Sequence, residues 1–174
     1  MADTPNVSLR PRVDADLDLL YEIAADLDTW EERNPEGPKP LTRAVHDARL
    51  AQKDESENVQ FVVDVDGKAV GAASLFGFDS LARHAEAGIN LAASARGRGI
   101  GTAAITQLVE FGFVRRNLHR IHLQLIASNV GALRAYEKAG FVVEGRQREQ
   151  AWVRGSYEDI VLMGILRSEY VPPA

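Results

Sequence analysis

The sequence predicts an α/β fold with a mixed, mostly antiparallel sheet of about seven strands, four helices and one parallel β-α-β crossover. Three observations support this prediction. Apolar residues alternate with a period of two in several segments and recur at helical spacing in others. Asp66-Gly67 is a typical two-residue hairpin turn. A glycine-rich turn near residue 100 joins a strand to a long helix, and the strand that returns past this helix lies parallel to the first.

The first third of the chain is predicted to form a strand, two helices and a loop. The apolar stripe of the first helix begins after Asp14 and Asp16, either of which can cap it. Three prolines then exclude regular structure, and Thr42 can cap the second, shorter helix. The expected elements are an edge-like strand at 7–12, a helix at 17–27, a loop at 31–40 and a helix at 42–52.

The remaining chain is predicted to alternate strands with two longer helices. Gly140 ends the second of these helices, because glycine readily adopts the left-handed conformation of a helix C-terminus. The buried face of the first is formed by Ile100, Ala104, Leu108 and Phe111. The expected elements are strands at 61–65, 68–78, 84–91 and 121–126, helices at 100–116 and 129–139, and a closing hairpin of strands at 141–153 and 157–166.

The composition is that of an ordinary globular protein. Of the 174 residues, 45% are hydrophobic and 26% are charged, so we expect a single domain over residues 1–174 with a core at about 7–167. No apolar run approaches the roughly 18 residues that span a bilayer, and the N-terminus does not resemble a signal peptide. The absence of cysteine excludes a disulfide scaffold and a cysteine nucleophile. We therefore expect a cytoplasmic protein with no membrane partner.

The charges and histidines argue against two further classes of protein. The formal net charge is −5 and the pI about 5.4, whereas a general nucleic-acid binder is basic. His119 and His122 lie three residues apart on a predicted strand, so alternation points them to opposite faces and makes them a poor metal pair. We expect neither a nucleic-acid partner nor a metal ion.

The glycine-rich turn, residues 96–102 (RGRGIGT), is a candidate anion site. It precedes a helix, whose free N–H groups and partial positive charge favour an anion, and its glycines let a phosphate approach the backbone. Arg96 and Arg98 add positive charge. The dinucleotide motif would need glycine where Thr102 stands, and no P-loop is present. The alternative is a tight turn with solvated arginines.

Two motifs resemble those of one family. Arg96-x-x-Gly99-x-Gly101 matches the R/Q-x-x-G-x-G/A motif of the Gcn5-related N-acetyltransferases (GNAT). Residues 129–141, which read NVGALRAYEKAGF, resemble that family's N-x-x-A-x-x-x-Y-x-K-x-G-F segment. The resemblance covers almost the whole chain. Three further segments are similar to the branch of spermidine N-acetyltransferases and ribosomal-protein N-terminal acetyltransferases: Ala85-Glu86, Glu144-Gly145 and Gly155-Ser156-Tyr157.

The resemblance implies an N-acetyltransferase with acetyl-CoA as its co-substrate. In the family, the amides of the glycine-rich loop bind the pyrophosphate. Two parallel strands splay apart there, and their free backbone groups pair with the pantetheine. The pantetheine would thus run between residues 91–93 and the strand that begins at Ile121. The implied cofactor-binding residues are Leu91, Ala92, Ala93, Arg96, Gly97, Arg98, Gly99, Ile100, Gly101, Thr102, Asn129, Ala132 and Tyr136.

Asn129, Ala132 and Tyr136 share one face of a predicted helix. Asn129 can donate to and accept from an amide-containing chain such as pantetheine. Tyr136 can protonate a leaving thiolate, because its ordinary pKa near 10 lies not far above that of a thiol. Alternatively, Asn129 is a helix cap and Tyr136 a half-buried core residue. The family match favours the functional interpretation.

Direct attack by an amine fits the sequence better than a covalent acyl-enzyme. Ser128 and Ser156 have no evident histidine or aspartate partner, so neither is an activated nucleophile. An alkylammonium must lose a proton before it attacks. Glu86 lies on the polar face of a predicted strand and is the candidate general base or ammonium anchor. The alternatives are a solvated strand glutamate and a base formed by a chain of waters.

An acidic segment suggests a cationic acceptor. Residues 26–57 contain nine acidic and five basic residues, a net charge of −4. In the family, the first two helices and their loop form one wall of the acceptor site, and a negative wall attracts cations. Trp30, Glu31 and Glu32 combine an aromatic face with two carboxylates, which suits an alkylammonium. Alternatively, these are ordinary solvated charges.

The sequence therefore predicts an acetyl-CoA-dependent N-acetyltransferase that acts by direct attack of a primary amine, with a polyamine or other small amine as acceptor. One alternative is a protein or peptide N-terminal acetyltransferase. An alternative of another class is a non-catalytic module that binds or senses acyl-CoA. The sequence leaves open the acyl group, acetyl or another such as succinyl. It also leaves open the oligomeric state, with a homodimer among the alternatives.

Overall fold

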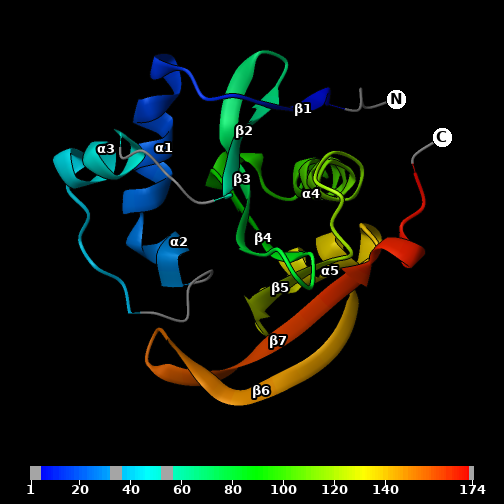
Figure 1. Ribbon diagram of the computed structural model, residues 1–174. Helices are drawn as coiled ribbons and strands as arrows, with labels where there is room; N and C mark the ends of the chain where they lie inside the picture. Colours follow the sequence, from blue (N-terminus) through cyan, green and yellow to red (C-terminus); the bar gives the residue numbers. More distant parts are fainter. Residues whose placement is uncertain (1–4, 32–36, 52–56, 173–174) are drawn as a thin grey trace.

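The computed structural model describes residues 5–31, 37–51 and 57–172. Its seven strands form one sheet in the order β1-β2-β3-β4-β5-β7-β6 (Figure 1). β4 and β5 are parallel, and every other neighbouring pair is antiparallel. The predicted fold class is thus confirmed. The strands are β1 (Val7–Arg10), β2 (Val59–Val65), β3 (Lys68–Asp79), β4 (His84–Leu91), β5 (Arg120–Ile126), β6 (Val142–Val153) and β7 (Ser156–Leu166).

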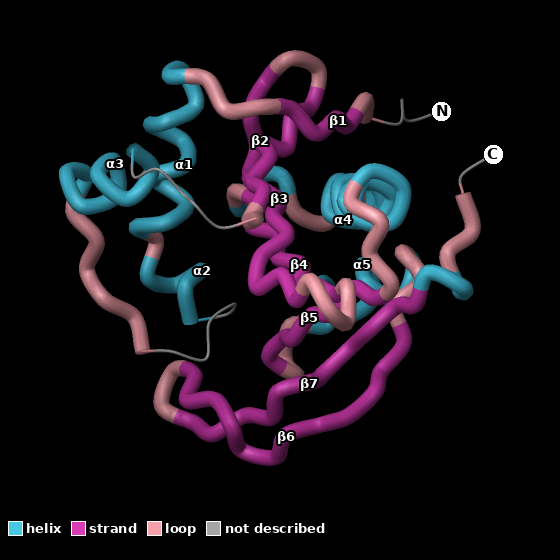
Figure 2. The backbone as a smooth tube through the Cα atoms, viewed as in Figure 1, coloured by secondary structure: helices cyan, strands magenta, loops and turns pink. Residues whose placement is uncertain are grey.

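Helices cover both faces of this sheet. α1 and α3 pack on one face, and α4 and α5 share the main apolar core on the other. The long β6–β7 hairpin curves away from the centre of the sheet toward α2 (Figure 2). In the described residues, no helix combines the length and the apolar character needed to cross a membrane. The helices are α1 (Leu17–Ala25), α2 (Leu27–Glu31), α3 (Arg43–Ala51), α4 (Ile100–Glu110) and α5 (Val130–Lys138).

Asp26 divides the first predicted helix in two. Its backbone is extended (φ −71°, ψ 104°), so α1 ends before it. Its Oδ1 atom accepts hydrogen bonds from the amides of Asp28 at 3.1 Å and Thr29 at 3.4 Å, which makes it the cap of α2. The apolar spacing continues through this break, and for that reason the sequence pattern predicted one helix.

Of the other predicted caps, Thr42 is confirmed and Asp16 is not. The Oγ1 atom of Thr42 accepts a hydrogen bond from the amide of Val45 at 3.4 Å, at the start of α3. Asp16 precedes α1, but its side chain caps no amide of that helix and accepts a hydrogen bond from the upstream amide of Val13 at 2.8 Å. Its buried carboxylate instead binds the guanidinium of Arg10 at 2.8 Å, and that guanidinium also binds Asp64 at 2.8 Å. The acidic residue before the helix therefore ties β1 and β2 to α1.

The end of the long helix differs from its prediction. The α-helical pattern stops at Glu110, and residues 111–115 form a turn of π-helix. This wider turn changes which aromatic side chain enters the core: Phe113 is fully buried, whereas Phe111 is only partly buried and packs edge-on against Phe61. The predicted buried residues Ile100, Ala104 and Leu108 are confirmed.

Candidate functional site

The two central strands part after only three residue pairs. β4 and β5 are paired from His84 with Arg120 to Glu86 with His122. Beyond that point β4 continues to Leu91 and β5 continues to residue 126, but the two strands no longer pair with each other. The backbone groups on the facing edges are therefore available to a ligand with amides of its own. The strand separation implied by the family resemblance is present.

The glycine-rich turn forms an open cradle at the start of α4. Gly97 and Gly99 have positive φ angles of 71° and 78°, and an added Cβ at either would meet no atom of the described residues within 4 Å. The amide of Ala103, in the first turn of α4, already donates to the carbonyl of Gly99 at 3.1 Å. The preceding amides, those of residues 100–102, lie in the first turn, where a helix has no partners of its own for them. This arrangement fits an anionic group such as a pyrophosphate.

Arg96 and Gly101 contribute to this cradle differently from what the sequence suggests. Arg96 holds the turn against β4, and the backbone conformation does not require a glycine at position 101. The Nε atom of Arg96 donates to the carbonyl of Leu91 at 3.2 Å, so the guanidinium ties the turn to the end of β4. Ala93–Ala95 forms a short 3-10 turn between them. Gly101 has no positive φ, and an added Cβ would meet Leu91 Cδ1 at an ordinary 3.6 Å. Only Gly97 and Gly99 are needed for the backbone conformation. Arg98 is exposed.

The predicted face of α5 is formed. Asn129 caps this helix, and its Oδ1 accepts a hydrogen bond from the amide of Ala132 at 3.1 Å. Tyr136 is only 7% exposed and belongs to the apolar core beside Phe141, with the two ring centroids 5.9 Å apart. Both structural alternatives from the sequence, a cap and a core tyrosine, are therefore present. They do not conflict with ligand contacts on the same face.

Burial strongly affects the acidity of Tyr136. Removal of the phenol from water raises its pKa to about 12, because the charged phenolate would be poorly solvated. The hydroxyl is therefore protonated at neutral pH and can act only as a proton or hydrogen-bond donor toward a developing anion. A thiolate formed in the same apolar surroundings would also have a raised pKa, which reduces the mismatch between the two groups.

Glu86 lies in a cavity of about 250 Å³ on the side of the sheet opposite the apolar core that contains Tyr136. Its neighbours in sequence, Ala85 and Ala87, are buried in the core, so alternation directs Glu86 away from that core. Burial raises the pKa of its carboxyl group, and a hydrogen bond from Gln124 partly opposes this rise. The lining residues are Glu86, Arg120, His122, Leu123, Gln124, Glu144, Leu162 and Met163.

The far wall of this cavity holds an ion pair. Both Nη atoms of Arg120 on β5 donate to the carboxylate of Glu144 on β6. This pair lowers the pKa of Glu144. The pKa of His122 is also lowered, first by burial and then by electrostatic repulsion from His84 and Arg120. The imidazole of His122 is therefore neutral at pH 7 and able to accept a proton.

Sequence reasoning missed His122, Gln124 and Arg120 as site residues. His119 precedes β5 and is exposed, whereas His122 lies within β5, and strand alternation does not say what His122 faces. A signal was present: residues 120, 122 and 124 share one strand face. The register that sets His122 beside Glu86 depends on how the crossover helix packs, and strand alternation alone does not specify it.

The predicted acceptor wall is only partly described. Trp30 is half-buried on α2. The carboxylate of Glu31 lies 3.8 Å from the Nε atom of Arg154, in the turn between β6 and β7, so α2 meets the tip of that hairpin. Arg154 also donates to the carbonyl of Asp28 at 3.3 Å. Glu32 lies outside the described residues. Part of the predicted negative charge is thus compensated by arginine.

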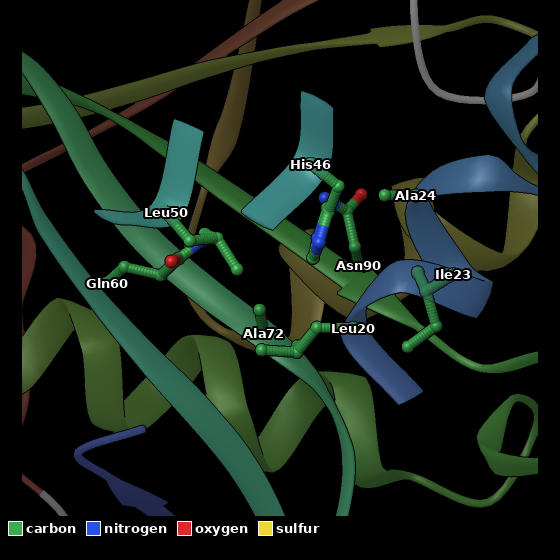
Figure 3. A pocket seen from close by; sticks show the side chains of 8 residues that line it. All are labelled: Leu20, Ile23, Ala24, His46, Leu50, Gln60, Ala72 and Asn90. Carbon is green, nitrogen blue, oxygen red and sulfur yellow. The ribbon is translucent and has the colours of Figure 1, made fainter. Parts of the chain in front are cut away.

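A smaller cavity of about 90 Å³ lies on the same sheet face, under α1 and α3 (Figure 3). Asn90 on β4 projects into it, and so does His46 from α3. Ligand pockets for molecules of drug size measure about 300–1,000 Å³, so this space can hold only a few atoms of a ligand or water. The larger cavity at Glu86 is the better candidate for the reaction. The lining residues are Leu20, Ile23, Ala24, His46, Leu50, Gln60, Ala72 and Asn90.

Comparison with known proteins identifies the class. A family model described as an acetyltransferase (GNAT) domain matches residues 6–142, well over half of the chain. The chain therefore belongs to the GNAT acetyltransferase family, and it is an N-acetyltransferase.

Several relatives are similar over most of the chain. Spermidine N(1)-acetyltransferase of Escherichia coli K12 is 29% identical over 174 residues, which cover 98% of this chain and 91% of the relative. The Vibrio cholerae spermidine N(1)-acetyltransferase is 32% identical over 118 residues, 68% of each chain. A putative ribosomal N-acetyltransferase of Bacillus subtilis is 32% identical over 105 residues, 60% of this chain and 57% of the relative.

The fold comparison points to the same branch. A crystal structure of spermidine N-acetyltransferase from Vibrio cholerae in complex with CoA and spermine superposes with a TM-score of 0.84 at 25% sequence identity. The match covers 94% of this chain and 96% of that one. The branch that the sequence motifs suggested is thus confirmed.

Proposed function

We propose that this enzyme transfers the acetyl group of acetyl-CoA to a primary amine of a polyamine, or of a similar small amine, by direct attack. The observation that carries the proposal is that Glu86 and Tyr136 lie on opposite sides of the sheet, near the point where β4 and β5 separate. Glu86 lies in the cavity on one side of the sheet, and Tyr136 lies in the core on the other. A thioester between the separated strands would be within reach of a base from one side and an acid from the other.

The residues present fit the co-substrate. The open cradle at Gly97 and Gly99 and the first amides of α4 would hold the pyrophosphate. The unpaired edges of β4 and β5 would pair with the pantetheine amides, with residues 91–93 on one edge and residues 123–126 on the other. When bound, acetyl-CoA supplies an acetyl group activated as a thioester.

Proton movement is the chemistry left to the protein. Glu86 accepts the proton of the incoming ammonium, and its raised pKa brings it closer to neutral pH, where a general base is more effective. Tyr136 donates to the sulfur as the C–S bond breaks. The cavity around Glu86 is partly enclosed, which strengthens the attraction between its carboxylate and an ammonium.

The acceptor is proposed from charge and from the relatives. Two of the relatives named above are spermidine N(1)-acetyltransferases, and the acidic segment over residues 26–57 would attract a polycation. The ion pair of Glu31 with Arg154 weakens this charge argument at one position. The second candidate acceptor is a peptide N-terminus, which the similarity to a putative ribosomal N-acetyltransferase favours.

A competitive amine panel tests the proposal. Release of free CoA thiol is measured with acetyl-CoA and, separately, spermidine, a short peptide with a free N-terminus, and an acidic amino acid. We expect spermidine to give the highest kcat/KM, with a decrease at high salt because the attraction is electrostatic. A peptide that far exceeds spermidine would assign the enzyme to N-terminal acetylation. An acidic amino acid as best substrate would refute the charge argument.

A further inference from the structure

We propose that His122 and His84 form a proton relay that carries the acceptor's proton from Glu86 to solvent at the turn between β3 and β4. The proposal rests on the proposed function, because it concerns the same amine. It starts from the end of the parallel pairing, where Glu86 and His122 are register partners. Neighbouring strands lie about 4.8 Å apart, so two register partners on one face have adjacent side chains. Both also line the 250 Å³ cavity.

The second step joins the two histidines. The ring centroids of His84 and His122 lie 5.3 Å apart in an edge-to-face arrangement. His84 precedes Glu86 by two residues on β4, so all three side chains share one sheet face. They form a continuous line of titratable groups from the cavity to the beginning of the strand.

The third step reaches solvent. The side chain of His84 is 34% exposed, and its Nε2 atom lies 3.9 Å from the carboxylate of Asp79, which is 47% exposed. The other ring nitrogen, Nδ1, is buried and has no hydrogen-bond partner among the described residues. A buried ring nitrogen without a partner is unusual and calls for a function or a bound water. In a relay, this atom exchanges a proton with the cavity side.

The charges around His122 suit a transient proton carrier. It faces His84 and Glu86 on β4, Arg120 on its own strand and Glu144 on β6. From β7 its register partner is the uncharged Gly164. Burial is the main cause that lowers the pKa of His122, electrostatic repulsion from His84 and Arg120 adds to it and Glu144 opposes it, whereas burial raises the pKa of Glu86. The two pKa values thus move toward each other, and the transfer between the groups requires less free energy.

The transfers balance as follows. The N–H bond of the ammonium breaks, and the nitrogen keeps the electron pair with which it attacks. The proton binds the carboxylate of Glu86, then the imidazole of His122, then that of His84. The His84 imidazolium releases it to water beside Asp79. Each transfer breaks one N–H or O–H bond and forms another, and no further reactant is needed.

The test compares His122→Gln with His119→Gln, using whichever amine the wild type acetylates fastest. His119 is an exposed histidine three residues away and serves as the matched control. We expect His122→Gln to lower kcat about 10- to 100-fold at pH 7, with KM little changed and the pH–rate profile shifted. Millimolar imidazole should restore part of the rate, because it replaces the missing proton acceptor. His119→Gln should behave as the wild type.

A second variant keeps the result interpretable. His84→Gln should show a smaller loss that imidazole also relieves. CoA affinity and circular dichroism report whether each variant is folded. A folded His122→Gln enzyme with an unchanged kcat and pH profile, or with a loss that imidazole does not affect, would overturn the relay. That result leaves the proposed function intact, because the wild type still acetylates its amine. If the wild type acetylates no amine at all, both proposals fail.

Discussion

Arg120 on β5 and Glu144 on β6 are joined by a two-pronged ion pair that crosses the strand between them directly above Gly164. A Cβ at Gly164 would lie 2.5 Å from Arg120 Nη1 and 2.5 Å from Glu144 Oε1. The absence of a side chain on β7 is therefore what lets this pair close the wall of the Glu86 cavity. The position explains a glycine within the apolar C-terminal half of β7, residues 160–166.

Gly164→Ala should break this pair rather than unfold the sheet, because the atoms in the way are the ends of two flexible side chains. We expect a loss of about 1 kcal/mol in the free energy of unfolding, since the pair is partly exposed. Arg120→Gln in the Gly164→Ala background should then add little, as measured by urea denaturation of both single variants and the double variant. Strictly additive losses would show that the two residues act independently.

Gly101→Val should weaken CoA binding with little effect on folding. Within the described residues, an added Cβ would contact Leu91 Cδ1 alone, at an ordinary distance of 3.6 Å, so the protein itself accommodates a side chain. The branched side chain would instead enter the proposed phosphate site. Calorimetric titration with CoA should show a decrease of at least about tenfold in affinity, or 1.4 kcal/mol. Gly101→Ala is the intermediate control. Unchanged affinity in the valine variant would refute the cradle assignment.

Tyr136→Phe should lower kcat by about 10²- to 10⁴-fold while CoA affinity barely changes, because the phenol is proposed to act only on the departing thiolate. The substitution keeps the ring that packs beside Phe141. The pKa of about 12 means that the wild-type phenol remains protonated throughout the assay range, so its ionisation should cause no fall in rate on the alkaline side of the pH–rate profile. Steady-state kinetics at saturating amine measure the change. A wild-type kcat would leave Tyr136 with a packing role alone.

Glu86→Gln should reduce kcat/KM more at pH 6–7 than at pH 9. At the lower pH the amine is almost entirely protonated and depends on the carboxylate to remove its proton. Because the pKa of Glu86 is raised, the wild-type rate should begin to fall on acidification at a higher pH than an ordinary glutamate would give. The glutamine variant should lack that fall. Two superimposable pH–rate profiles would argue against any role in proton transfer.

Asp16 should make the fold sensitive to acid. The hydrogen bonds from Arg10 are the main reason that the pKa of this buried carboxyl lies below its ordinary value. Because the folded pKa is depressed, the contribution to stability is complete above the unfolded pKa of about 4 and is lost as the pH falls toward the folded pKa. Asp16→Asn should lower the free energy of unfolding at pH 7 by about 1.5–3 kcal/mol and flatten its acid dependence. The exposed Asp14→Asn variant is the control. Equal effects of the two substitutions would contradict this assignment.

Most of the strand order could be predicted from local patterns. The hairpin at Asp66-Gly67 and the crossover past the glycine-rich turn each follow from residues that are close in sequence. The predictions of helix bounds and of core residues were wrong where a local sequence pattern is compatible with more than one structure. The apolar spacing runs through Asp26, although its side chain ends one helix and caps the next. The π-helical turn exchanges Phe111 for Phe113 in the core.

The sequence by itself determined the α/β class, the family, the position of the glycine-rich turn before α4 and the strand face of Glu86, because these depend on short motifs and on alternation along single elements. Only the tertiary structure decided what faces Glu86. His122 and the Arg120–Glu144 pair reach the same cavity because four strands that are separated in sequence, β4, β5, β7 and β6, pair side by side. Register results from the packing of whole elements, and a shift of one residue would turn each of these side chains to the opposite face.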